Sequence, residues 1–142
     1  YESGQSLLEA VVAVGLVIVI ATALISATTV GLKTGQSGKL RSRAVIVSQD
    51  GLELSRKLRD SDWAVFQAYG TALGKAWCLD GTGLWTVQFG SCPFNIDNLY
   101  ARTMTFTWES ANSRMKVDSV VSWNEGSLVK DVTLTTYFTD WR

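Results

Sequence analysis

The most constraining feature of this sequence is an uncharged stretch that runs from Ala10 to Leu32. Its 23 positions contain no Asp, Glu, Lys or Arg and are rich in Val, Ile, Leu and Ala. About 20 apolar residues are enough for a helix to cross the ~30 Å hydrocarbon layer of a membrane. A helix in lipid satisfies its own backbone hydrogen bonds, so the β-branched residues do not prevent helix formation. The stretch predicts a helix that lies in a membrane or packs on copies of itself.

A secretory signal peptide and an ordinary single-pass anchor are two simple interpretations of this stretch. A signal peptide has a basic start, an apolar core of about 7 to 15 residues and a small-residue cleavage site. The stretch is longer than such a core, and the chain opens Tyr1-Glu2-Ser3-Gly4 without a base. Ser26-Ala27-Thr28 could nevertheless serve as a small-residue site, so this alternative stays open.

Charge is balanced overall and uneven along the chain. Thirteen basic residues match thirteen acidic ones, so the basic excess typical of nucleic-acid readers is missing. Residues 33–60 carry seven bases against three acids, and residues 61–142 carry six bases against eight acids. The basic residues from Lys33 to Arg43 could touch DNA or anionic lipid, but a polar rim between packed subunits is the preferred interpretation. We predict no specific nucleic-acid partner.

The composition also argues against an enzyme. The chain has no His, which excludes imidazole bases, Ser-His-Asp triads and His-ligated metals. Oxygen ligands occur in Asp60-Ser61-Asp62 and in residues 94–98, but neither spacing matches a calcium-binding EF-hand loop. Gly81-Thr82-Gly83 lacks the lysine of a phosphate-binding loop. We therefore predict no catalytic residue, metal, cofactor or small-molecule ligand.

Glu9 is the unusual residue, because it places a carboxylate at the edge of the uncharged stretch. A carboxylate inside a membrane costs about 2.5 to 3.5 kcal/mol on insertion scales, so it needs a partner there. The nearest candidate is a free α-amine made by cleaving the chain. The block Gly4-Gln5-Ser6-Leu7-Leu8-Glu9, followed by the apolar stretch, resembles the prepilin motif of type IV pilins and pseudopilins. That resemblance covers residues 4–32.

The resemblance implies a processing site and an assembly contact. Gly4 corresponds to the last leader residue, so residues 1–4 would be the end of a leader that a prepilin peptidase removes. Gln5 would become the N-terminus, whose amine is methylated in the family; most members have Phe at this position. Glu9 corresponds to the family glutamate, which would pair with the amine of Gln5 on a neighbouring subunit. A pilin-like fold is also implied.

The rest of the chain predicts an α+β fold with an amphipathic helix and a β-sheet head. Residues 5–35 form the hydrophobic helix, residues 36–62 its amphipathic half and residues 63–142 the head. An apolar stripe at helical spacing consists of Leu40, Ala44, Val47, Gly51, Leu54 and Leu58. Alternating or hairpin patterns predict strands at residues 76–79, 84–89, 102–109, 115–123 and 128–138. We expect the last three strands to form an antiparallel sheet whose apolar face packs on the helix stripe.

Cys78 and Cys92 enclose a 15-residue segment of the head. A disulfide over such a loop adds about 3 kcal/mol of stability in the chain-entropy model and needs an oxidising compartment. A head outside the cytoplasmic membrane would provide that compartment. Two buried free thiols are the alternative.

The leading hypothesis is a structural subunit of a type IV pilus. The chain would be stored in the cytoplasmic membrane, then polymerise with copies of itself into an extracellular filament through the pilus assembly machinery. A minor pilin or a secretion pseudopilin is an alternative within the same superfamily. A monomeric, membrane-anchored binding module is an alternative outside it. Adhesion, motility, DNA uptake and secretion are all compatible with these residues.

Overall fold

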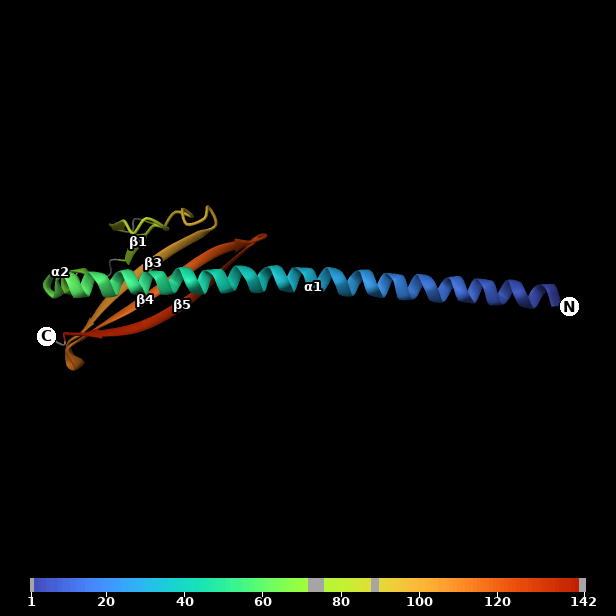
Figure 1. The fold of residues 1–142 in the computed structure, drawn as a ribbon, viewed down its shortest axis with the longest axis horizontal. Coiled ribbons are helices and arrows are strands. Elements are labelled where there is room, and N and C mark those ends of the chain that lie inside the picture. Colours follow the sequence, from blue (N-terminus) through green and yellow to red (C-terminus); the bar gives the residue numbers. More distant parts are fainter. Residues whose placement is uncertain (1, 72–75, 88–89, 141–142) are drawn as a thin grey trace. The chain divides into compact units, whose positions relative to one another are not determined.

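The structure is a computed structural model that describes residues 2–71, 76–87 and 90–140. It is an α+β fold with one long helix and a five-stranded antiparallel sheet (Figure 1). The helices are α1 (Glu2–Ser61) and α2 (Trp63–Thr71), with a 3-10 turn, η1 (Ser110–Asn112). The strands are β1 (Ala76–Leu79), β2 (Trp85–Val87), β3 (Tyr100–Glu109), β4 (Arg114–Glu125) and β5 (Leu128–Thr139). The chain divides into two units, residues 1–39 and residues 40–142.

The first unit is helical and consists of the N-terminal part of α1. It contains no proline, and Gly15, Gly31 and Gly35 have no side chain within 4 Å of the position where a Cβ would lie. Glycine in a helix costs roughly 0.5 to 1 kcal/mol relative to alanine, so these positions weaken the helix without breaking it. Helix formation through the apolar stretch agrees with the sequence-based prediction.

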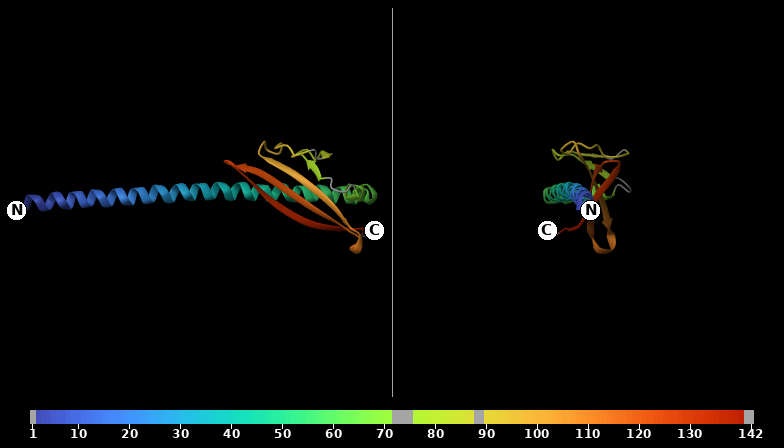
Figure 2. Two further views of the ribbon diagram at one scale, coloured as in Figure 1. Left: turned by 180° about the vertical axis from the view of Figure 1, so that it is seen from behind. Right: turned by 90° about the vertical axis from the view of Figure 1, so that its right-hand side faces the viewer.

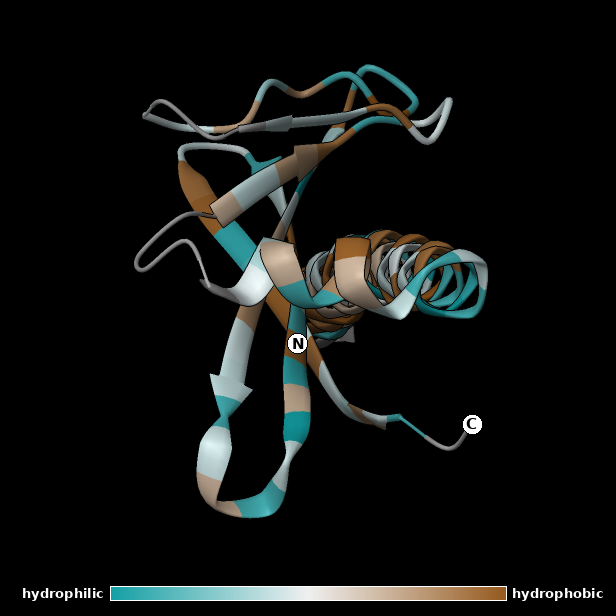
Figure 3. Cartoon of the chain, turned by 90° about the vertical axis from the view of Figure 1, so that its left-hand side faces the viewer, coloured by the Kyte–Doolittle hydropathy of each residue, from teal (hydrophilic) through white to brown (hydrophobic). Residues whose placement is uncertain are grey.

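The second unit combines residues 40–61 of α1 with α2 and the sheet. The strand order is β2-β1-β3-β4-β5, and every neighbouring pair is antiparallel. The long strands β3, β4 and β5 run beside this part of α1 and cross it obliquely (Figure 2). Hydrophobic and polar residues alternate along the long strands (Figure 3), which makes one face of the sheet mainly apolar. Buried residues of β3, β4 and β5 pack against α1 and α2 from this face. The three predicted C-terminal strands are confirmed, each slightly longer than expected.

The predicted helix stripe packs on the sheet. Ala44, Val47 and Gly51 are buried, and the other three stripe residues are half-buried. Two serines on the same side are also fully buried: Ser48 donates a hydrogen bond to the carbonyl oxygen of Ser119 at 2.9 Å, and Ser55 donates to that of Gly51 at 2.9 Å. Their hydroxyls are therefore satisfied in the core.

Among the described residues, the core has a larger and a smaller hydrophobic cluster, and a third that is formed only by Cys78, Cys92 and Ala101. The larger one is centred on Phe66 of α2, whose ring meets those of Phe106 and Phe138 edge-on at centroid distances of 5.7 and 5.4 Å. The smaller cluster lies toward Leu40 and consists of Ala44, Val47, Ile96, Tyr100, Val121 and Trp123. Trp123 is buried, and four other tryptophans pack on the larger cluster: Trp63, Trp77, Trp85 and Trp108.

Helix α2 is a feature that the composition of the head did not predict. Asp62 caps it, because its carboxylate accepts a hydrogen bond from the backbone N–H of Val65 at 3.1 Å. The helix places Phe66 in the core and Gly70 against Met115 of β4. The sequence predicted a β-sheet head over residues 63–142 with its first strand at residues 76–79, and the structure adds the helix α2 before that strand.

Candidate functional site

The apolar side chains that the structure describes in the first unit, from Leu7 to Leu32, are all exposed. The large hydrophobic residues between Leu7 and Leu32 have exposed fractions from 54% to 70%. By length and composition this part of α1 could cross a membrane. Apolar patches on monomeric soluble proteins rarely exceed a few hundred Å². A continuous apolar surface of this length therefore indicates a contact with a membrane or with another protein.

The hydroxyl groups within this surface are satisfied by the helix itself. Thr22 donates to the carbonyl oxygens of Ile18 and Val19, and Ser26 donates to that of Thr22. Thr28 and Thr29 both donate to the carbonyl oxygen of Ile25, at 2.9 and 2.8 Å. These groups need no water, so the surface is compatible with an apolar environment.

Glu9 lies on α1 near the start of this surface and is exposed. It makes no hydrogen bond or ion pair with any residue that the structure describes. Gly4 and Gln5 are helical in their backbone, and their side-chain positions lie outside the described part of the chain, as does Tyr1. The predicted contact between Glu9 and the amine of Gln5 joins two subunits, so a single chain does not test it.

Cys78 and Cys92 form a disulfide with a Cα–Cα distance of 5.4 Å. The bond is buried against Ala101 of β3, and the hydroxyl of Thr103 donates a hydrogen bond to the sulfur of Cys92 at 3.2 Å. It holds the segment after β2 against β3. Residues 88 and 89 of the predicted strand 84–89 lie outside the described chain, and β2 ends at Val87.

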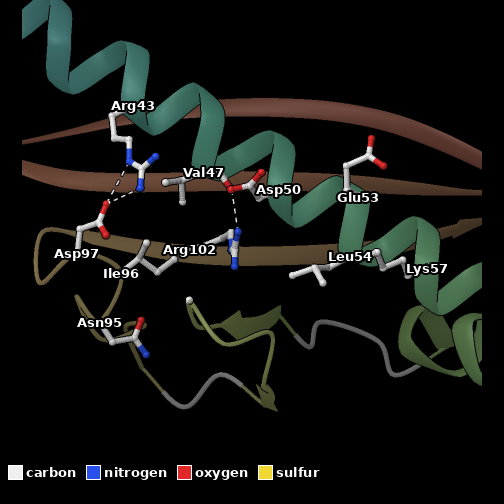
Figure 4. Close-up of a pocket in the computed structure, with 11 residues that line it drawn as sticks. Arg43, Val47, Asp50, Glu53, Leu54, Lys57, Asn95, Ile96, Asp97 and Arg102 are labelled. Carbon is white, nitrogen blue, oxygen red and sulfur yellow. Dashed lines mark hydrogen bonds and ion pairs between the residues drawn. The ribbon is translucent and has the colours of Figure 1, made fainter.

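A cleft of about 410 Å³ lies between residues 43–57 of α1 and the segments around Gly81 and Asn95 (Figure 4). Arg43, on its rim, forms an ion pair with Asp97 at 2.9 Å. Hydrogen bonding and attraction to this carboxylate raise the pKa of the Arg43 guanidinium. Asp97 has a left-handed backbone with φ of 53°, which Asp tolerates better than most residues and which belongs to the turn between Ile96 and Tyr100.

Arg102 lines the same cleft and is only 3% exposed. Its guanidinium donates to three backbone carbonyl oxygens: Val47 at 2.7 Å, Asp80 at 2.7 Å and Leu79 at 3.2 Å. Burial lowers the pKa of this guanidinium, and the nearby charges of Asp50 and Asp80 oppose that shift. The sequence analysis did not single out this residue. It lies two positions before Met104 and four before Phe106, so its side chain points to the same, buried face of β3.

The remaining acidic segments have structural contacts. The carboxylate of Asp80 accepts hydrogen bonds from the hydroxyl of Thr82 and from the backbone N–H groups of Thr82 and Leu84, and these bonds lower its pKa. The segment Gly81-Thr82-Gly83 is thus the turn between β1 and β2, with Gly83 at a φ of 89°. Within the described chain, Asp62 caps α2 and no group of three His, Cys, Asp or Glu residues is placed to hold a metal.

Comparisons with protein-family models, with curated proteins and with solved structures found no match to this chain. The fold itself has a long apolar N-terminal helix whose C-terminal part packs on an antiparallel sheet. This arrangement is compatible with a pilin-like architecture.

Proposed function

We propose that the chain is a structural subunit of a type IV pilus or a closely similar filament. The observation that carries the proposal is the uncharged, largely apolar surface from Ala10 to Leu32, which is exposed on α1 and directly follows Glu9. A prepilin-type motif precedes that surface at residues 4–9. The exposed surface needs lipid before assembly and neighbouring copies of the same helix afterwards.

The proposed cycle begins with the chain in the cytoplasmic membrane and its head outside. A prepilin peptidase cleaves after Gly4, and Gln5 becomes the N-terminal residue. The assembly machinery then moves the helix from lipid into a bundle of identical helices. The Cys78–Cys92 disulfide supports a head in an oxidising compartment.

Glu9 sets the axial position of each subunit in this proposal. Its carboxylate pairs with the cationic amine of Gln5 on a neighbouring copy once both are buried among apolar helices. Leaving either charge buried alone costs several kcal/mol, so helices that stack in another register are disfavoured. The pair therefore determines the axial register of neighbouring helices more than it increases the stability of the filament. The chain itself has no proposed catalytic role.

Two measurements test this function. Mass spectrometry of the membrane-extracted protein should give an N-terminus at Gln5, and electron microscopy of sheared surface material should show filaments that contain its peptides. An N-terminus that keeps Tyr1 to Gly4 in a non-polymeric chain would instead indicate a membrane-anchored binding module. A processed chain present at a few copies per filament would indicate a minor pilin or pseudopilin.

A further inference from the structure

The strand β5 is a free edge of the sheet. It pairs with β4 along its whole length, and with no other element that the structure describes. Every second residue of an antiparallel edge strand turns its backbone N–H and C=O groups away from the neighbouring strand. In β5 these groups make no backbone hydrogen bond with the rest of the described chain. Such an edge offers its hydrogen bonds to an added strand of another chain.

The free edge of β5 lacks the features that usually prevent strand addition. Proteins protect their edges with proline, with β-bulges and with charged side chains. Residues 132–139 contain no proline, glycine or charged residue, and β5 pairs with β4 residue by residue without a bulge. Every residue of β5 except Phe138 is exposed or half-buried. An added strand would therefore meet neither a charge nor a kink along most of this edge.

The partner that fits this edge in length is β5 of a second copy. β5 has 12 residues, whereas β2, the other edge strand of the described sheet, has three. Pairing β5 with β2 would leave most of β5 uncovered. Two identical edges pair by two-fold symmetry, which makes the strands antiparallel. A parallel pair in register would instead place Lys130 against Lys130 of the other copy, and like charges in opposite positions are destabilising.

One antiparallel register matches the side chains along almost the whole strand. It places Thr133 opposite Thr133 of the second copy, so that residues 128–138 of each strand are paired. Val129 then lies opposite Tyr137 of the second copy, on the face where these side chains are 67% and 47% exposed. A β-branched residue opposite an aromatic one is a favourable cross-strand pair.

The charged residues of β5 favour the same register. With Thr133 on the axis, Lys130 and Asp131 each lie opposite a threonine of the second copy, so no like charges meet. Sliding the strands by two residues places Lys130 opposite Phe138 in one direction and opposite Leu134 in the other. A slip by one residue turns the apolar face of one head to the polar side of the other. The pattern of β5 is therefore self-complementary in one register.

We infer that the free edge of β5 binds β5 of a second copy, antiparallel and with Thr133 on the two-fold axis. The contact joins the sheets of two heads into one continuous sheet. It closes on two copies, whereas the proposed contact between Glu9 and Gln5 links each subunit to the next. The inference therefore does not rest on the proposed filament.

The test uses the full chain in mild detergent with its native disulfide kept. Under mild oxidation, T133C should form an intermolecular disulfide. Opposite Cα atoms of antiparallel strands lie about 4.5 or 5.5 Å apart, within the disulfide range of about 4.4 to 6.8 Å. The matched control is T107C, an exposed threonine on the inner strand β3. We expect at least about tenfold more linked dimer from T133C than from T107C, because only the first brings two cysteines to bonding distance.

A mixture of V129C and Y137C, carried on chains with different affinity tags, tests the register. The mixed disulfide should form, and each variant alone should give little dimer, because its own cysteines would lie about 27 Å apart along the strands. Adding T133K to both variants should abolish the mixed disulfide, since two ammonium groups would meet at the axis. Adding T107K should leave it unchanged. Near-UV circular dichroism confirms that each lysine variant is folded.

Three outcomes would overturn the inference. Equal dimer yields from T133C and T107C would mean that the chains associate through other surfaces. A T133C chain that stays monomeric would mean that a different chain covers this edge. A mixed disulfide no more abundant than the V129C and Y137C homodimers, or one that survives T133K, would exclude the antiparallel register. None of these results changes the expected cleavage after Gly4 or the role of Glu9, so the filament proposal is tested separately.

Discussion

The guanidinium of Arg102 on β3 donates a hydrogen bond of 2.7 Å to the carbonyl oxygen of Val47 on α1. Two further bonds reach the carbonyl oxygens of Leu79 and Asp80, at the end of β1. One buried cation therefore joins the helix, the central strand and the β1–β2 turn. Its charge is compensated by carbonyl dipoles and by Asp50 and Asp80 at longer range.

Replacing Arg102 with Met should destabilise the second unit by about 2 to 4 kcal/mol. Hydrogen bonds to a charged group contribute roughly 1.5 to 3 kcal/mol, and the substitution leaves three carbonyl groups without their donor. The measurement is chemical denaturation of the full chain in detergent, followed by near-UV circular dichroism. The control is R43M, which removes an exposed ion pair and should cost less than about 1 kcal/mol. Equal losses in the two variants would contradict this role for Arg102.

Gly51 allows α1 to approach the sheet next to Arg102. A Cβ at this position would lie 3.0 Å from Arg102 Cδ, 3.0 Å from Met104 Sδ and 3.1 Å from Ser119 Oγ. We expect G51A to lower stability by about 1 to 3 kcal/mol, because overpacking outweighs the gain of about 1 kcal/mol in helix propensity.

The matched control for Gly51 is G35A on the same helix, where the added Cβ has nothing within 4 Å. This variant should be neutral or more stable by up to about 1 kcal/mol. Thermal denaturation of both variants, followed by circular dichroism, checks the contrast. A G51A chain as stable as G35A would show that the helix and the sheet are further apart than the structure indicates.

The disulfide contributes to the head through the loop that it closes. Its cysteines are 14 residues apart, so reduction should cost about 3 kcal/mol in the chain-entropy model. Denaturation with and without a phosphine reductant measures the difference. The C78S/C92S variant should match the reduced protein and show no further change with reductant. If the denaturation midpoint does not change on reduction, contacts with β3 hold the segment around Cys92 in place without the disulfide.

The Asp80 carboxylate predicts a pH dependence of stability. Its pKa is lower in the folded chain because Thr82 and Leu84 donate hydrogen bonds to the charged form. The unfolded chain therefore binds the proton more tightly, so this contribution is complete above the unfolded pKa of about 3.9 and is lost as the pH falls through the folded value. Urea midpoints at pH 5 and pH 3 should differ more for the wild-type chain than for D80N. The same pH difference in both proteins would exclude Asp80 as its source.

Much of the fold follows from local patterns in the sequence. The alternation of Met104, Phe106 and Trp108 sets which face of β3 turns inward, and the spacing of Ala44, Val47 and Gly51 sets the helix face that meets it. Both patterns reflect burial of apolar surface at the period of the element. The strands and the helix stripe were predictable for this reason.

The contacts that cross the fold were not predictable in the same way. Asp97 pairs with Arg43 across 54 positions, and nothing in either local sequence marks the other as its partner. Arg102 is charged, so a pattern based on hydrophobicity does not predict its burial, although its position in β3 places it on the inward face. Helix α2 is only nine residues long, and its run of aromatic and apolar residues is equally typical of a strand. The proposed contact of Glu9 would join two chains, so neither the sequence nor the structure of one chain can contain it.

The most direct test of the proposed role of Glu9 is the yield of filaments from a chain with the substitution E9A. We expect this variant to be cleaved and to insert into the membrane at the wild-type level, while its amount in the sheared filament fraction falls to near background. The matched control is E53A, an exposed carboxylate on the same helix in the sheet-packed unit, which should assemble normally. Wild-type filament yield from E9A would contradict the central claim that this carboxylate sets the subunit contact.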